Sequence, residues 1–266
     1  METQVAERNY WAPAFALAWR EIVRFARQRS RVVGALGTPV VFWLLIGSGL
    51  GRSFQPAGQT EQVGYLEYFF PGTIMLVVMF TAIFCMISVI EDRREGFMQA
   101  VLASPAQRLA IVFGKVAGST VLATAQGLLF LLLAPLSGVP LTLLSFFGVA
   151  GMLLLVALGL SGFGLLMAWP LDSTQGFHAV MNLLLMPMWF LSGALFPASG
   201  AASWIAWLVH LNPLTYGLAA IRHVMYGDAA ARIAGDLPSP VLSVCVSVGF
   251  AVLTLALSVR VVSRRN

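Results

Sequence analysis

The sequence predicts an all-α polytopic membrane protein, and three observations lead to this conclusion. Residues 116–171 and 173–221 contain no Asp, Glu, Lys or Arg, which gives charge-free runs of 56 and 49 residues. The chain is 59% hydrophobic and only 10% charged, whereas soluble domains carry about 25% charged residues. A helix needs about 20 apolar residues to cross a bilayer. Each run can therefore cross twice, or cross once and dip back, and we interpret residues 1–266 as one membrane domain.

The first predicted element is an N-terminal amphipathic helix over residues 14–31. Its basic residues recur three or four positions apart and so share one helical face: Arg20, Arg24, Arg27 and Arg31. Trp19 belongs to the largely apolar opposite face. A basic helix with a Trp, placed just before a span, is expected to lie in the cytoplasmic membrane interface. The alternative is an ordinary positively charged flank that happens to be helical.

Apolar runs predict six spans, at residues 32–51, 69–90, 116–136, 143–168, 176–196 and 241–259. Residues 197–240 admit two interpretations, namely a further full span or a re-entrant hairpin at 200–221 before the last span. With six spans and a cytoplasmic N-terminus, 13 Lys and Arg residues lie inside and 3 outside, against 12 and 4 for seven spans. The positive-inside rule therefore favours six spans with both termini cytoplasmic.

The sequence lacks the motifs of the common catalytic sites. It contains no P-loop, no G-x-S-x-G and no H-E-x-x-H, and its three histidines show no metal-ligand spacing. We therefore expect no enzyme activity, cofactor or metal in this chain. The basic residues lie beside the spans, which indicates contact with membrane lipid rather than with nucleic acid.

The segment 91–115 shows the sequence pattern that most clearly indicates a contact with another molecule. Acidic side chains stand where a short helix would begin, an apolar stripe follows, and Pro105 ends the helix. Such a helix, held in the cytosol between two spans, could dock into the groove of a soluble partner. It could equally lie flat on the membrane surface.

Polar or aromatic residues inside the predicted spans are candidates for lining a transport pathway: Ser48, Thr81, Ser88, Thr120, Thr124, Gln126, Asn182, Trp189 and Ser192. Each could instead form an interhelical hydrogen bond. No charged ring is predicted along the spans, which argues against a strongly charged, hydrated ion as substrate. A hydrophobic or amphipathic substrate fits better.

Two blocks of sequence resemble the permeases of ABC-2 type transporters. The first block comprises Asp92-Arg-Arg-Glu-Gly96, Leu102-Ala-Ser-Pro105, Arg108 and Gly114-Lys115. The second comprises Pro187-Met-Trp-Phe-Leu-Ser-Gly-Ala-Leu-Phe-Pro197, Trp204, Asn212-Pro-Leu-Thr-Tyr216, Arg222 and Gly227. Phe97 departs from the pattern, because many members of the family carry a small polar residue there.

The resemblance implies a six-span half-transporter of the cytoplasmic (inner) membrane that pairs as a homodimer or with a homologous permease. A separate cytoplasmic ABC ATPase subunit would bind ATP and Mg²⁺. Residues 92–103 would form the coupling helix, and the segment before the last span would be re-entrant from the outer side. The coupling residues it implies are Asp92, Arg93, Arg94, Glu95, Phe97, Met98, Val101 and Leu102.

The expected function is ATP-driven export of a drug, antibiotic or lipid-like molecule from the cytoplasm or the inner leaflet. Export of a lipid-linked polysaccharide by the same family is the alternative. A secondary transporter would be expected to show inverted repeats, and a membrane-embedded enzyme would need clustered catalytic residues at one interface.

Overall fold

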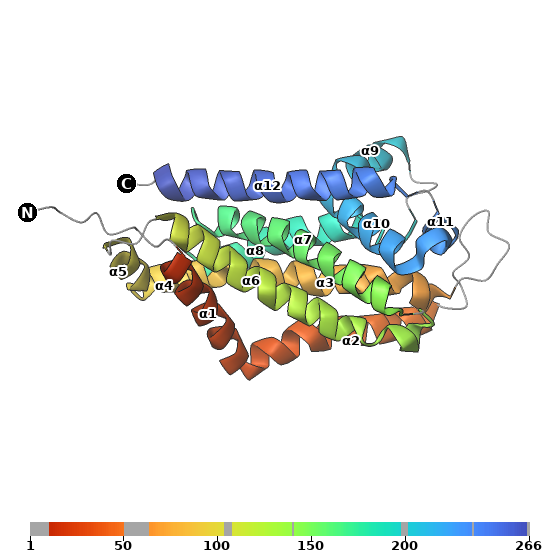
Figure 1. The fold of residues 1–266 in the computed structure, drawn as a ribbon, viewed down its shortest axis with the longest axis horizontal. Helices are drawn as coiled ribbons and strands as arrows, with labels where there is room; N and C mark the ends of the chain where they lie inside the picture. The colour runs from red at the N-terminus through yellow and green to blue at the C-terminus, as the bar shows by residue number, and fades with distance from the viewer. Residues whose placement is uncertain are drawn as a thin grey trace, which may run out of the picture.

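The computed structural model describes residues 11–50, 64–103, 108–139, 141–197, 202–235 and 237–264, and these residues form helices joined by short turns. No strand occurs among them. The helices lie side by side in an elongated bundle (Figure 1). Four described segments are long and apolar enough to cross a membrane: Tyr65–Arg94, Arg108–Leu131, Leu143–Ala168 and Pro240–Arg264. The predicted all-α membrane architecture is thus confirmed, whereas the number of spans remains a prediction.

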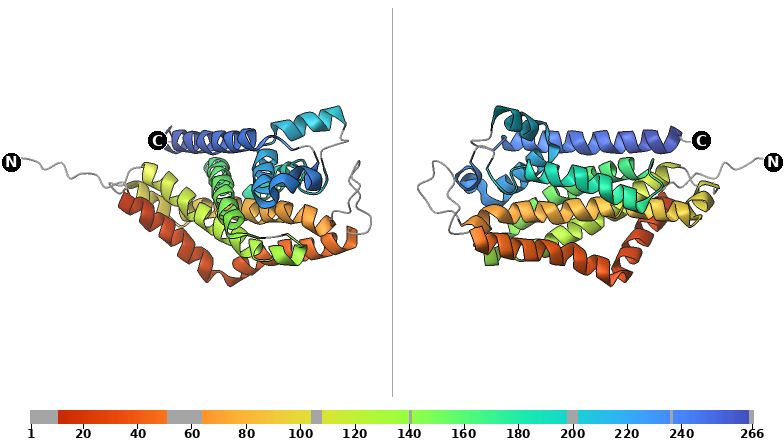
Figure 2. Two further views of the ribbon diagram at one scale, coloured as in Figure 1. Left: turned by 45° about the vertical axis from the view of Figure 1, so that its right-hand side comes forward. Right: turned by 180° about the vertical axis from the view of Figure 1, so that it is seen from behind.

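The N-terminal segment forms two helices that meet at a sharp bend (Figure 2). Helix α1 (Trp11–Arg27) ends where the backbone N–H of Gln28 bonds the carbonyl of Phe25 at 3.0 Å, and α2 (Arg29–Leu50) follows. The predicted helix over 14–31 therefore ends earlier, and Arg31 belongs to α2. Of the span predicted at 32–51, Gly51 lies outside the described residues.

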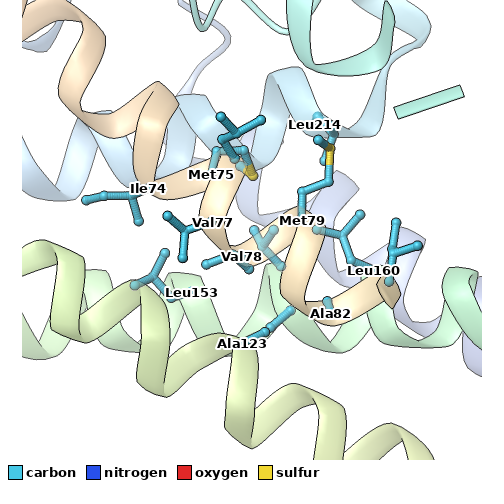
Figure 3. Close-up of a cluster of buried hydrophobic side chains, with 14 of the residues drawn as sticks. Ile74, Met75, Val77, Val78, Met79, Ala82, Ala123, Leu153, Leu160 and Leu214 are labelled. Atoms are coloured by element: carbon cyan, nitrogen blue, oxygen red, sulfur yellow. The ribbon is translucent and has the colours of Figure 1, made fainter. Parts of the chain in front are cut away.

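The second apolar segment lies at the centre of the bundle. It consists of α3 (Tyr65–Phe84) and α4 (Ile87–Arg94), joined by a tight turn at Cys85–Met86. Side chains of α3 pack against those of the surrounding helices in a continuous apolar core (Figure 3). The core residues labelled in the figure are Ile74, Met75, Val77, Val78, Met79, Ala82, Ala123, Leu153, Leu160 and Leu214.

The segment predicted as one coupling helix over residues 92–103 is divided into two. Residues 92–94 end α4, and a separate short helix, α5 (Phe97–Ala103), begins after Gly96. The backbone φ of Gly96 is +80°, a conformation that glycine adopts without a steric penalty. The glycine therefore ends α4 and redirects the chain into α5.

Two long helices follow. Helix α6 (Arg108–Leu131) begins well before the predicted residue 116, so that Lys115 lies inside the helix. It also ends before the predicted residue 136. After the short 3₁₀ helix η1 (Ala134–Ser137), α7 (Leu143–Ala168) spans the residues predicted for the fourth span. The hydroxyl of Thr142 caps α7 by accepting a hydrogen bond from the backbone N–H of Ser145 at 3.1 Å.

The C-terminal third contains several short helices and one long one. Helix α8 (Thr174–Phe190) ends before the predicted residue 196, and Gly193 in the following turn has a φ of +82°. The segment predicted as a re-entrant hairpin at 200–221 contains two helices, divided at Asn212. Residues 200 and 201 of this segment lie outside the described residues. The elements are α9 (Ser203–Leu211), α10 (Pro213–Tyr226), η2 (Gly227–Ala229), α11 (Ala230–Ala234) and α12 (Pro240–Arg264).

The two ends of the bundle differ. Helix α5, the start of α1 and the last turns of α12 lie at one end, whereas α9 and α11 lie at the other (Figure 1). The end that contains α5 is called the coupling end below.

Candidate functional site

A buried cluster of charges lies at the coupling end, where α1, α4 and α6 meet. Asp92 on α4 is completely buried, with 0% exposure. Its carboxylate accepts two hydrogen bonds from Arg20, at 2.7 and 2.9 Å, and one from Arg24 at 3.0 Å. The ammonium of Lys115, which is 1% exposed, also donates to Asp92. We call this group, with Glu21, Ser88 and Glu91, the ion cluster.

The remaining members of the ion cluster satisfy its other charges. Lys115 donates to the carboxylate of Glu21 at 2.6 Å and to the hydroxyl of Ser88 at 3.1 Å. Arg24 donates to Glu91 at 2.7 Å. Three cations therefore face three carboxylates, as buried charges require. The pKa of Arg20 is raised, first because its guanidinium donates hydrogen bonds to Asp92.

Helix α1 reaches the ion cluster because two glycines let it approach α6 closely. A Cβ atom on Gly114 would lie 2.7 Å from the carbonyl oxygen of Ala14, and one on Gly118 would lie 2.9 Å from that of Ala18. Glycines four residues apart form a flat helical surface on which another helix can rest. Arg20 and Glu21 are thereby brought within reach of Asp92 and Lys115.

The ion cluster also contacts the short helix α5. The guanidinium carbon of Arg20 lies 3.9 Å from the centre of the Phe97 ring, which is a cation–π geometry. Met98 is only 3% exposed, and Phe97 and Val101 pack against the same apolar core. Most of the predicted apolar stripe of α5 therefore faces its own chain, and Leu102, at 43% exposure, is the large apolar side chain that it presents outward.

Two of the implied coupling residues, Arg93 and Arg94, contact the segment that follows α7. Arg93 donates to the carbonyl of Trp169 at 2.6 Å and to the carboxylate of Asp172 at 3.0 Å. Arg94 donates to the backbone oxygen of Asp172 at 3.1 Å. Arg94 and Glu95 remain exposed, so they could still contact a partner, whereas Asp92 cannot do so in this conformation.

Most of the predicted pathway-lining residues lie inside the packed chain. Thr81 donates to Gln126, Thr120 donates to Ser161 at 3.3 Å, and these bonds join different helices. Buried side chains of this group are Thr81, Ser88, Thr120, Thr124, Gln126, Trp189 and Ser192. Asn182 is exposed on α8, and the side chain of Ser48 lies outside what the structure describes. A lining role for any of them remains a prediction.

Trp189 and Ser192 belong to the opposite end of the bundle. The indole N–H of Trp189 donates to the carbonyl of Gly72 at 2.8 Å, and Ser192 donates to the carbonyl of Trp189 at 2.7 Å. The bond from Trp189 to Gly72 connects the end of α8 to α3.

Sequence reasoning missed the ion cluster, although it noted several of its residues separately. Arg20 and Arg24 were predicted to face the membrane interface, and Lys115 was placed at the edge of a span. A usable signal was present, since Asp92 and Lys115 mark the ends of neighbouring predicted spans and so lie at a similar depth. Opposite charges at one depth in adjacent spans are expected to pair.

The comparison with known families decides the classification. The family model described as ABC-2 type transporter matches residues 14–226, most of the chain. The chain belongs to the ABC-2 type transporter family.

Two relatives carry names consistent with this family. The daunorubicin resistance ABC transporter permease protein DrrB1 of Streptomyces coeruleorubidus is 24% identical over 93% of this chain and 85% of its own. Nodulation protein J of Rhizobium leguminosarum bv. viciae is 26% identical over 95% of this chain and 92% of its own.

This membership confirms the resemblance drawn from the two sequence blocks. The ABC-2 permease is an integral membrane protein of an ABC transporter, and its family implies a partnership with an ATPase subunit. Among the described residues of the permease, no group of three potential metal ligands occurs.

Proposed function

We propose that this ABC-2 permease is the transmembrane half of an ATP-driven exporter and that α5 couples it to a separate cytoplasmic ATPase. The observation that carries the proposal is the ion cluster, which ties α1, α4 and α6 together directly beneath α5. A force applied to α5 would therefore reach three helices at once. Two copies would pair around the pathway, with six spans each, α9 and α10 re-entrant, and both termini cytoplasmic.

The contact with the ATPase would involve the outward side of α5. Its exposed residues, together with those just before it, are Arg94, Glu95, Gln99, Ala100, Leu102 and Ala103. Leu102 would supply the apolar anchor, because buried apolar groups usually dominate such interfaces. Phe97, Met98 and Val101 would hold α5 against the permease so that it moves as a unit with the ion cluster.

The proposed substrate class follows from the side chains that the membrane-spanning helices carry. The described spans carry apolar and uncharged polar side chains over most of their length, which suits an amphipathic molecule. The name of DrrB1 refers to daunorubicin resistance, which makes daunorubicin a suitable probe. Export of a lipid-linked polysaccharide would use the same coupling.

Cross-linking tests the coupling. In a variant without native cysteines (Cys85→Ser, Cys245→Ser), Gln99→Cys is expected to cross-link to the co-expressed ABC ATPase subunit. Ala231→Cys, at an exposed position of α11 at the opposite end, serves as the matched control and is expected not to cross-link. Cross-linking of Ala231→Cys alone would place the ATPase at the wrong end and refute the proposal.

Transport assays test the energy source. Inverted membrane vesicles that contain both subunits are expected to accumulate daunorubicin with ATP, and a protonophore should leave the rate unchanged. Loss of accumulation with the protonophore, while ATP is present, would instead indicate a secondary transporter.

A further inference from the structure

A second buried cation lies far from the ion cluster. Arg222 is on α10, close to α9 and α11 at the end of the bundle opposite the coupling end (Figure 1), and is 2% exposed. Its Nη2 donates to the backbone oxygens of Tyr68 at 3.3 Å and of Gly193 at 3.0 Å. Its guanidinium carbon lies 4.5 Å from the centre of the Tyr68 ring. All of these partners are uncharged.

Arg222 therefore forms no ion pair within the described part of the chain. No described carboxylate lies within ion-pair distance of it, whereas buried Lys115 and half-buried Arg20 and Arg24 of the ion cluster each have one. Its buried Nε has no hydrogen-bond partner, and its Nη1 donates to no described residue. A buried guanidinium without an anion is strongly unfavourable, so an anion that fits the site would be bound in preference to water.

Arg222 lines a cavity of about 240 Å³. This volume is several times the roughly 30 Å³ that one water molecule occupies in the liquid, so it can hold a phosphate group. Ser192 and Thr215 also line the cavity, but their hydroxyls donate to the carbonyls of Trp189 and Val209, at 2.7 and 2.8 Å. Neither hydroxyl can supply the missing negative charge.

One wall of the cavity is formed by α9, a helix that also carries exposed Trp side chains. Ala206 and His210 of α9 form part of its wall. The same helix exposes Trp204 and Trp207, and exposed Trp is typical of the level of the lipid headgroups. A phospholipid could place its phosphate in the cavity while its acyl chains follow the apolar faces of the helices.

We propose that this cavity binds the phosphate group of a membrane phospholipid, with Arg222 as the residue that recognises its charge. The assignment needs only the membrane location of the permease and does not depend on export or on the ATPase. Arg suits this role because its fixed N–H groups match the oxygens of a phosphate.

Binding of short-chain lipids to the purified full-length permease in dodecyl maltoside tests the proposal. Native mass spectrometry counts the bound lipid, and Trp fluorescence gives its affinity. Dioctanoyl phosphatidylglycerol is expected to bind at least tenfold more tightly than dioctanoylglycerol, which lacks the phosphate. Arg222→Gln should lose at least tenfold in affinity, whereas Arg232→Gln, an exposed Arg on α11 outside the cavity wall, should lose none.

A second variant guards against misfolding of Arg222→Gln. Ala206→Leu fills the cavity from α9 and leaves the hydrogen bonds of Arg222 intact, so it should also lose at least tenfold in affinity. Full binding by Ala206→Leu, or equal binding of the two lipids by the unchanged permease, would overturn the proposal. Inorganic phosphate that binds as tightly as the lipid would overturn the lipid as its source.

Discussion

Replacing Asp92 with Asn should cost more stability than almost any other single change at the coupling end. The carboxylate is fully buried and accepts hydrogen bonds from Arg20, Arg24 and Lys115. Removing one partner from a buried ion pair typically costs about 3–5 kcal/mol, because the other charge stays buried without compensation. In a chain of this size, that corresponds to a fall in Tm of roughly 10 °C, on the scale of about 2–4 °C per kcal/mol.

The assay is thermal unfolding of the purified permease in detergent, followed by Trp fluorescence. Asp172→Asn is the matched control, since Asp172 also pairs with an arginine but its side chain is 83% exposed. An exposed pair contributes little, so its Tm should hardly change. The double variant Asp92→Asn, Lys115→Met should recover part of the loss, because it again gives the ion cluster equal numbers of cations and carboxylates. Equal Tm values for Asp92→Asn and Asp172→Asn would refute the role assigned to the ion cluster.

Three further predictions concern packing and coupling. Gly118→Ala should destabilise the permease by about 1–3 kcal/mol through overpacking against Ala18, whereas Gly151→Ala, with open space around it, should not; thermal unfolding compares the two. Leu102→Asp should lower ATP-dependent substrate uptake into inverted vesicles at least tenfold at an unchanged yield of purified protein. A lower yield would instead indicate a structural role. Trp189→Phe should cost about 0.5–1.5 kcal/mol in the same unfolding assay because the hydrogen bond to the carbonyl of Gly72 is lost, and an unchanged Tm would contradict this.

The helical membrane architecture could be predicted from the sequence because it follows from long apolar runs without charge. Helix α7 shows this well, since its bounds are set by apolar length together with a local cap at Thr142. The ends of other helices depend on contacts made by residues distant in sequence. Helix α6 begins at Arg108, and Lys115 inside it donates hydrogen bonds to Glu21 and Asp92. No local pattern near Lys115 reveals those partners.

The helix boundaries near the candidate site could not be predicted. The sequence predicts one helix over residues 92–103 with an acidic start, whereas Glu91 and Asp92 belong to the end of α4 and only the apolar stripe belongs to α5. Which side of that helix faces outward could not be predicted, because the orientation depends on the φ of Gly96 and on the position of Arg20 above Phe97. Both are fixed by tertiary packing.

The glycine at position 96 has a consequence for how motion could pass through the permease. Before Gly96 in the sequence, the ion cluster fixes α1, α4 and α6 relative to one another. A shift of any of these helices by one turn would separate its charged groups from their partners inside the protein. On the other side of Gly96, α5 is only seven residues long. Rotation about one flexible backbone position can therefore tilt α5 without disturbing the spans, whereas a larger displacement must carry all three helices as a rigid block.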